Sequence, residues 1–360
     1  MKKFSAILLC IIMALSLLAG CARGTVGGNS MNENTTSSTD TSGASDTSST
    51  PVPTTTFEIR LGHCVADEHP YNQGALKFAQ LVSEGTGGAV IVDVFGNSQL
   101  GAERDMVEGL QLGTVDMCLI STAPLSGFTS EFHAFDLPYL LTTPEQARGV
   151  CDSEIGQKML DTLSAQGIKG LVYYENGFRN LTNSKHPIVE PGDLEGLKVR
   201  TMENEIMMYT FSVMDADPTP IAFNELYTAL QQKTIDAQEN PYALIYSTKL
   251  YEAQTYLSIS EHFYAPAPLL MAQTLWDSLP AEYQDVIMQA AAESRDYERD
   301  LLDQWNSELI GKLEELGMEV NEIDRDAFVE ATKPVYDKYV GDGEGQVPAS
   351  LVESIASFQP

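Results

Sequence analysis

Two arginines stand out as side chains that could bind an anion. The chain has only 21 Lys and Arg residues against 51 Asp and Glu residues, so cations are scarce. Arg200 closes the strand-like run 197–200, and Arg179 lies within the segment 176–182. A guanidinium matches a carboxylate in a two-pronged geometry that an ammonium cannot reproduce. The pattern predicts a carboxylate site near a cleft, although salt bridges to the abundant acids explain either arginine equally well.

Catalytic motifs are missing from the sequence. It contains no G-x-S-x-G, no H-E-x-x-H, no phosphate-cradling Gly-rich loop and no zinc-ligand spacing. Of the five histidines, only His63 and His69 lie close together in sequence, and both could be ordinary loop residues. We therefore expect no catalytic residues, no cofactor and no metal. A tethered hydrolase is kept as an alternative that turnover of an ester or glycoside would reveal.

The N-terminus predicts export and lipidation. Lys2 and Lys3 precede an apolar run, residues 7–18, and small residues stand directly before Cys21. This pattern is typical of a signal peptide, here residues 1–20, that ends at a lipoprotein processing site. Two or three acyl chains on Cys21 would anchor the protein at the outer face of the cytoplasmic membrane. Ordinary secretory cleavage is the alternative.

The segment after Cys21 is dominated by Ser, Thr, Gly and Asn and has almost no large apolar residue. Such composition cannot bury a core, so residues 21–56 are interpreted as the lipidated cysteine and a flexible tether. The formal net charge of the chain is −30. A surface this acidic repels nucleic acid and anionic lipid, so we expect neither as a partner and a membrane contact through the lipid anchor only.

The first part of residues 57–360 alternates between strand and helix patterns. Strands are expected at 57–63, 89–95 and 115–120, with helices at 70–84 and 100–112. This order implies a parallel sheet with helices on its faces. Ligands of such sheets bind beyond the carboxyl ends of the strands. The rule places the polar residues that follow these strands on one rim, among them His63, Ser121 and Thr122.

A second α/β unit follows. Its expected elements are strands at 168–175 and 197–201, helices at 203–214, 224–232 and 241–251, and an extended return at 259–271. Two crossings between the units predict an α/β, two-lobed, periplasmic-binding-protein-like clam-shell with a hinge. The expected lobe I is 57–177 plus about 264–306. The expected lobe II is 178–263 plus about 307–360.

A long helix is expected from 280 to 316, with Ser278 as N-cap and Gly317 as terminator. At 1.5 Å per residue it would be about 55 Å long and would span both lobes. A coiled-coil dimer is the competing interpretation. The apolar stripe of the helix is irregular and fits packing onto one protein better, so we expect a monomer.

Several ordered motifs resemble those of a known family. The matching runs are VF (94–95), QLGAER (99–104), FDLPY (135–139), GFRNLT (177–182), DLEGLKVR (193–200), PTPIAF (218–223), NELYTALQQ (224–232) and DAQENP (236–241). From about residue 57 to the C-terminus, the chain resembles the substrate-binding proteins of tripartite ATP-independent periplasmic (TRAP) transporters, in the dicarboxylate-receptor family.

The resemblance implies a role for particular residues. Arg200 would pair with the ligand carboxylate, and Asn240 would hold that carboxylate and arginine in place. Arg179 and Phe223 would line the same cleft. Three first-lobe residues, His63, Ser121 and Thr122, would contact the far end of the ligand. Glu203 would be the acidic residue opposite them. A carboxylate that loses water in a closing cleft needs charge-assisted hydrogen bonds in return.

The predicted function is that of an extracytoplasmic receptor, which captures a small organic-acid anion and delivers it to the membrane subunits of a TRAP-type transporter. The polar first-lobe residues offer partners for hydroxyl groups but no obvious second cation. A hydroxylated acid, such as a uronate or aldonate, is therefore favoured over a C4-dicarboxylate. Arg104 could supply a second positive contact, which would favour a dicarboxylate. The alternative function is presentation of the ligand to a membrane sensor kinase.

Overall fold

The computed structural model describes residues 56–343 and 345–360. The expected signal peptide, the lipidation site at Cys21 and the tether up to residue 55 lie outside the described residues. Within them, the strands form one nine-stranded mixed sheet in the order β2-β1-β3-β8-β4-β7-β5-β6, and β9 pairs with β8. The strands are β1 (Phe57–Gly62), β2 (Val90–Phe95), β3 (Met117–Leu119), β4 (Ile168–Asn183), β5 (Lys198–Thr201), β6 (Asp217–Pro220), β7 (Ala237–Asn240), β8 (Tyr256–Ala272) and β9 (Glu319–Glu322).

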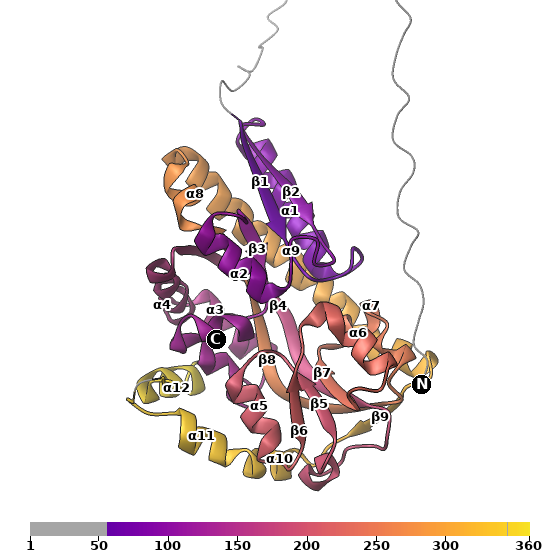
Figure 1. Ribbon diagram of the computed structural model, residues 1–360. Helices are drawn as coiled ribbons and strands as arrows, with labels where there is room; N and C mark the ends of the chain where they lie inside the picture. The colour runs from indigo at the N-terminus through magenta and orange to yellow at the C-terminus, as the bar shows by residue number, and fades with distance from the viewer. Residues whose placement is uncertain (1–55, 344) are drawn as a thin grey trace, which may run out of the picture. The chain divides into compact units, whose positions relative to one another are not determined.

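Helices cover both faces of this sheet (Figure 1). The α-helices are α1 (Pro70–Gly85), α2 (Glu103–Leu112), α3 (Pro144–Asp152), α4 (Glu154–Thr162), α5 (Glu205–Ser212), α6 (Phe223–Gln231), α7 (Tyr242–Ser247), α8 (Gln273–Ser278), α9 (Ala281–Glu315), α10 (Arg325–Ala331), α11 (Lys333–Tyr339) and α12 (Ala349–Ala356). Two 3₁₀ helices, η1 (Ala123–Gly127) and η2 (Ser130–Asp136), follow β3. No helix among the described residues is both long and apolar enough to cross a membrane.

The first lobe is built on β1, β2 and β3, which run parallel. Alternation in β1 buries Ile59 and Leu61 in one core cluster with the apolar face of α1. Helix α2 ends at Gly113, whose φ of 70° is left-handed, a conformation in which glycine avoids the steric cost of a side chain. The predicted β-α-β-α-β order of this lobe is therefore confirmed, with element ends that differ by a few residues.

The second lobe repeats the arrangement with β5, β6 and β7, also parallel. Strand β6 was not predicted, because the run Asp217-Pro218-Thr219-Pro220 carries two prolines. Proline cannot donate to a ladder and is tolerated in an edge strand. In the sheet order β6 is indeed the last strand on its side.

Strands β4 and β8 connect the two lobes. They pair antiparallel from Ile168 opposite Ala272 to Asn183 opposite Tyr256, with three register shifts along the way. Gly177 lies at one of these shifts with a φ of 100°, and it pairs with Ala265. The predicted lobe boundaries at 177/178 and 263/264 thus fall opposite one another in the interior of two paired strands. The boundaries themselves remain a proposal.

Helix α9 is the predicted long helix, and at 1.5 Å per residue its 35 residues extend for about 52 Å. It packs against α1 of the first lobe, against the connecting strand β4 and against α7 of the second lobe (Figure 1). The expected N-cap was wrong, because Ser278 closes the short helix α8 and α9 begins after Pro280. The chain leaves α9 through Gly317, as expected.

The C-terminal segment, part of the expected lobe II (307–360), also packs against elements of the expected lobe I. Val335 and Ile355 belong to the same core cluster as Ala147 and Val150 of α3. The Gln146 side chain donates a hydrogen bond to the carbonyl of Ile355 at 3.3 Å. Helices α11 and α12 therefore pack against α5 and α4, and α12 lies on the first-lobe side.

Candidate ligand-binding site

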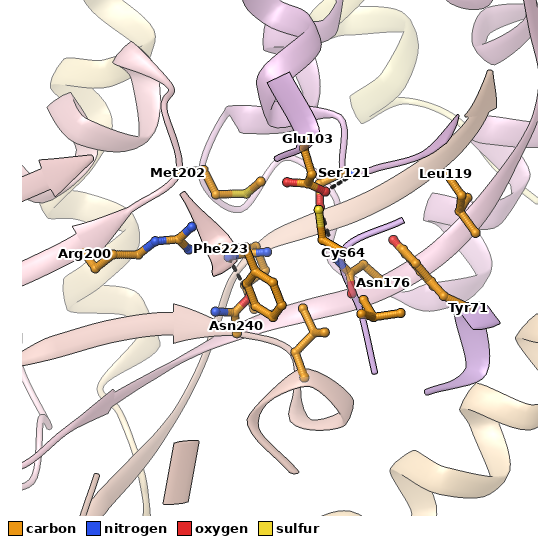
Figure 2. Close-up of a pocket in the computed structure, with 13 residues that line it drawn as sticks. Cys64, Tyr71, Glu103, Leu119, Ser121, Asn176, Arg200, Met202, Phe223 and Asn240 are labelled. Atoms are coloured by element: carbon orange, nitrogen blue, oxygen red, sulfur yellow. Dashed lines mark hydrogen bonds between the residues drawn. The ribbon is translucent and has the colours of Figure 1, made fainter. Parts of the chain in front are cut away.

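A small cavity lies where the carboxyl ends of strands from both lobes meet, as the rim rule predicts. It encloses about 10 Å³, about the minimum that one water molecule needs. Figure 2 shows side chains converging on it from β4, β5, β7 and the segments after β1 and β3. The lining residues are Cys64, Val65, Tyr71, Glu103, Leu119, Ser121, Asn176, Arg179, Arg200, Met202, Phe223, Asn240 and Leu244.

Arg179 forms a buried ion pair with Glu239. Its Nε donates to Glu239 Oε2 at 2.5 Å, and its Nη2 donates to Glu239 Oε1 at 2.7 Å and to Asn240 Oδ1 at 3.0 Å. His262 Nε2 lies 3.3 Å from Glu239 Oε2. Burial alone would raise the pKa of Glu239, but Arg179 and His262 outweigh it and lower that pKa to about 2. The charge of Arg179 is thus neutralised inside the protein.

Arg200 is equally buried but has little to pair with. Arg200 is only 1% exposed. Its Nε donates a hydrogen bond to the carbonyl of Ile221 at 2.8 Å, and its Nη1 has no hydrogen-bond partner. No carboxylate within residues 56–343 and 345–360 forms an ion pair with it. Burial lowers the pKa of Arg200 to about 10, although Glu239 opposes the change. A buried guanidinium left in this state is energetically costly unless an anion compensates it.

Asn240 lies at the end of β7 and contacts the guanidinium of Arg179. Its Oδ1 accepts from Arg179 rather than from Arg200, which differs from the expected contact, and its Nδ2 donates to Gln238 Oε1 at 2.5 Å. Phe223, the first residue of α6, is half-buried and lines the same cavity. Figure 2 shows both side chains beside the guanidinium of Arg200.

The opposite wall comes mainly from the first lobe and is polar. The backbone N–H of Ser121 donates to Glu103 Oε1 at 2.7 Å. Asn176 Nδ2 donates to Ser121 Oγ at 3.2 Å, while Asn176 Oδ1 and the Tyr71 hydroxyl have no protein partner. This wall therefore lines the cavity with polar side chains, two of which have an oxygen atom without a protein partner.

Four expected site residues do not line this cavity. Thr122 lines an adjacent one of about 10 Å³, which shares Ser121 and Arg179 with the first. His63 is buried and its Nε2 lies 3.1 Å from Asn72 Oδ1; burial lowers its pKa. Glu203 is exposed on the surface. Arg104 is also exposed, pairs with Glu108 at 3.1 Å and lies over the ring of Phe128. Arg104, considered from the sequence as a second cation for the ligand, therefore does not line this cavity.

Sequence reasoning missed several lining residues, namely Cys64, Tyr71, Glu103, Asn176 and Met202. A usable signal existed for Glu103, since it stands beside Arg104 at the start of a helix that follows a rim loop. Tyr71 carried no such signal, because it lies within α1 and reaches the cavity only through the packing of that helix. Across residues 56–343 and 345–360, no cluster of His, Cys, Asp or Glu is arranged to hold a metal ion.

Comparison with known families identifies the class of protein. Residues 61–342 match the family described as "Bacterial extracellular solute-binding protein, family 7", and the chain belongs to this family. A "Solute-binding protein" of Verminephrobacter eiseniae is 40% identical over 283 residues, covering 78% of this chain and 83% of the relative. The "2,3-diketo-L-gulonate-binding periplasmic protein YiaO" of Escherichia coli is 34% identical over 305 residues, covering 84% and 92%.

Solved structures of TRAP periplasmic solute-binding proteins share the fold. One from a Polaromonas species, bound to D-erythronate, has a TM-score of 0.81 at 37% identity and covers 84% of this chain and 99% of its own. One from Sulfurospirillum deleyianum, with bound succinate, has a TM-score of 0.80 at 28% identity, with 85% and 100% covered. The two-lobed α/β fold and the family resemblance predicted from the sequence are thus confirmed.

Proposed function

We propose that this extracytoplasmic receptor binds a small organic-acid anion through Arg200 and delivers it to the membrane subunits of a TRAP-type secondary transporter. The observation that carries the proposal is the buried guanidinium of Arg200, which has one hydrogen bond and no ion pair among the described residues. A ligand carboxylate would supply the charge-assisted hydrogen bonds that this side chain lacks.

The surrounding residues support particular roles. Arg179 is held by Glu239 and Asn240, so it presents a fixed polar edge beside the carboxylate rather than a free charge. Phe223 would pack on the carbon skeleton of the ligand. Pockets for small molecules typically occupy about 300–1,000 Å³, far more than the 10 Å³ enclosed here. Binding would therefore require the lobes to part and close again around the ligand.

The wider context fits a receptor and not an enzyme. Relatives and structural neighbours are named for binding a sugar acid or a dicarboxylate. We further propose that Cys21 carries the lipid anchor, that the protein acts as a monomer and that it catalyses no reaction. The lipoprotein pattern around Cys21 and the packing of α9 within one chain support these points. The sensor-kinase alternative has no observation of its own.

Isothermal titration of the purified full-length protein with D-galacturonate, D-galactonate, D-erythronate and succinate tests the binding proposal. We expect at least one acid to bind, and Arg200→Ala to weaken it by about 2–5 kcal/mol, roughly 30-fold to several-thousand-fold. Arg200→Lys should also bind poorly, because an ammonium lacks the fork. Arg104→Ala is the matched control and should bind normally. Equal binding by wild type and Arg200→Ala would reject the proposal.

A further inference from the structure

We propose that Glu103 is the specificity-determining residue of this site, which it restricts to hydroxylated monocarboxylates by repelling any second carboxylate. The inference rests on the proposed function, since it assumes that Arg200 holds the first carboxylate. It goes further by assigning the far end of the ligand. Glu103 had been noticed in the sequence only as part of a motif, and the structure places it in the cavity wall.

The position of Glu103 is fixed by two elements. It is the first residue of α2, and one of its carboxylate oxygens accepts the backbone N–H of Ser121 at 2.7 Å. The second oxygen has no hydrogen bond to the described residues and is available to a ligand. Among the residues drawn in Figure 2, the carboxylate of Glu103 and the guanidinium of Arg200 come from different elements, α2 and β5. They attract one another electrostatically but form no ion pair.

The cavity wall offers one cation that a ligand carboxylate can pair with. The charged lining residues are Glu103, Arg179 and Arg200. Arg179 is already neutralised by Glu239, so Arg200 is the lining cation that a ligand can use. A ligand with one carboxylate compensates it. A ligand with a second carboxylate would place that group near Glu103 with no cation to accept it, and like charges in a partly desolvated site repel strongly.

Hydrogen-bond chemistry favours the same ligands. The free oxygen of Glu103 and the unpartnered Asn176 Oδ1 are acceptors, and the Tyr71 hydroxyl is also without a partner. Hydroxyl groups of a sugar acid can donate to these atoms. A second carboxylate brings acceptors only, so it would leave them unsatisfied at a cost in binding. The site therefore recognises an anion at one end and donors at the other.

A merely structural role for Glu103, in holding Ser121, makes a different prediction. Glu103→Gln keeps an oxygen that accepts the Ser121 N–H but removes the negative charge. If holding Ser121 were the whole role, this substitution would leave ligand preference unchanged. Glu108→Gln on the same helix is the matched control, because Glu108 is exposed and pairs with Arg104.

The test compares D-galactonate with D-galactarate, which differ in the second terminal carboxylate, by isothermal titration of the full-length protein. We expect wild type to prefer galactonate at least tenfold and Glu103→Gln to reduce that ratio at least tenfold. Glu108→Gln should keep the wild-type ratio. The wild-type ratio is informative even if Glu103→Gln fails to fold, and Glu103→Asp, which keeps the charge, should still reject galactarate.

The outcomes separate this inference from the proposed function. Wild type that binds galactarate or succinate as tightly as galactonate, or an unchanged ratio in Glu103→Gln, would overturn the role of Glu103 while Arg200-dependent binding stands. Binding that survives Arg200→Ala, or no binding of any acid, would reject the proposed function and this inference with it.

Discussion

Arg179 and Arg200 lie in the same buried region and illustrate how one residue type serves two purposes. Arg179 is compensated by the carboxylate of Glu239, which makes it part of the scaffold. Arg200 is compensated by no carboxylate among the described residues and lines the cavity. The difference arises from the neighbours on β7, not from the arginines or their sequence contexts. At the scale of residues, partners therefore distinguish a binding cation from a structural one.

We predict that Glu239→Gln destabilises the protein by about 3–5 kcal/mol at pH 7, because it leaves Arg179 as an uncompensated buried charge. The pKa of Glu239 is lowered to about 2, so its stabilising contribution is complete above the ordinary carboxyl pKa and is lost as pH falls through about 2. Urea unfolding at pH 7 and at pH 3 measures this.

The stability difference between wild type and Glu239→Gln should shrink on acidification. Replacing both partners, as in Arg179→Met with Glu239→Leu, should recover much of the lost stability, since no buried charge remains. A double variant that is less stable than Glu239→Gln would contradict this account of the pair.

At the scale of elements, the contact of α9 with β4 buries a carboxyl group without a cation directly on it. Glu298 is 0% exposed, its Oε2 accepts the N–H of Glu175 at 3.0 Å, and its Oε1 has no partner. Burial and the nearby Glu175 raise the pKa of Glu298 well above its ordinary value, although Arg299 and Arg148 oppose this. The docking of α9 on β4 therefore favours the protonated form of the Glu298 carboxyl.

A raised carboxyl pKa means that the folded state holds a proton that the unfolded state releases, so stability falls as pH rises above about 4.5. We predict that Glu298→Gln, which mimics the neutral acid, melts at a higher temperature than wild type at pH 8 and at a similar temperature near pH 4. Glu293→Gln, on an exposed part of α9, is the control. A shift of equal size at both pH values would argue against a protonated Glu298.

The elements also show what a single sequence can and cannot predict. Helix α9 and the strands of the first lobe were predictable, because their apolar periodicity is local information. Strand β6 was not predicted because its two prolines are unusual in a strand. Helices α3 and α4 were not predicted either. In the site, Arg179, Arg200 and Asn240 were found through motifs. Tyr71 could not be found, because its place in the cavity depends on how α1 packs.

At the scale of the whole molecule, the net charge of −30 opposes the capture of any anion. Salt screens long-range repulsion: the Debye length falls from about 30 Å at 0.01 M to about 8 Å at 0.15 M. We predict that the association rate of a sugar-acid anion increases several-fold over this range, while the dissociation rate changes little. Stopped-flow fluorescence from the two tryptophans would measure both.

A buried contact is screened far less than the surface field, so the Arg200 pairing should not weaken in parallel. Arg104→Ala, which removes an exposed cation, should slow association slightly at low salt and not at high salt. An association rate that falls as salt is added would indicate that local cations, and not the acidic surface as a whole, control the encounter.

The pairing of β4 with β8 across the lobe boundary has a mechanical consequence. Two lobes joined by single extended linkers would swing almost freely, but here opening must twist a two-stranded ribbon at its bulges near Gly177. We expect the resting twist of this ribbon to set the fraction of molecules that are in the binding-competent conformation. Because apparent affinity scales with that fraction, the stiffness of this ribbon can tune affinity without changing which atoms contact the ligand.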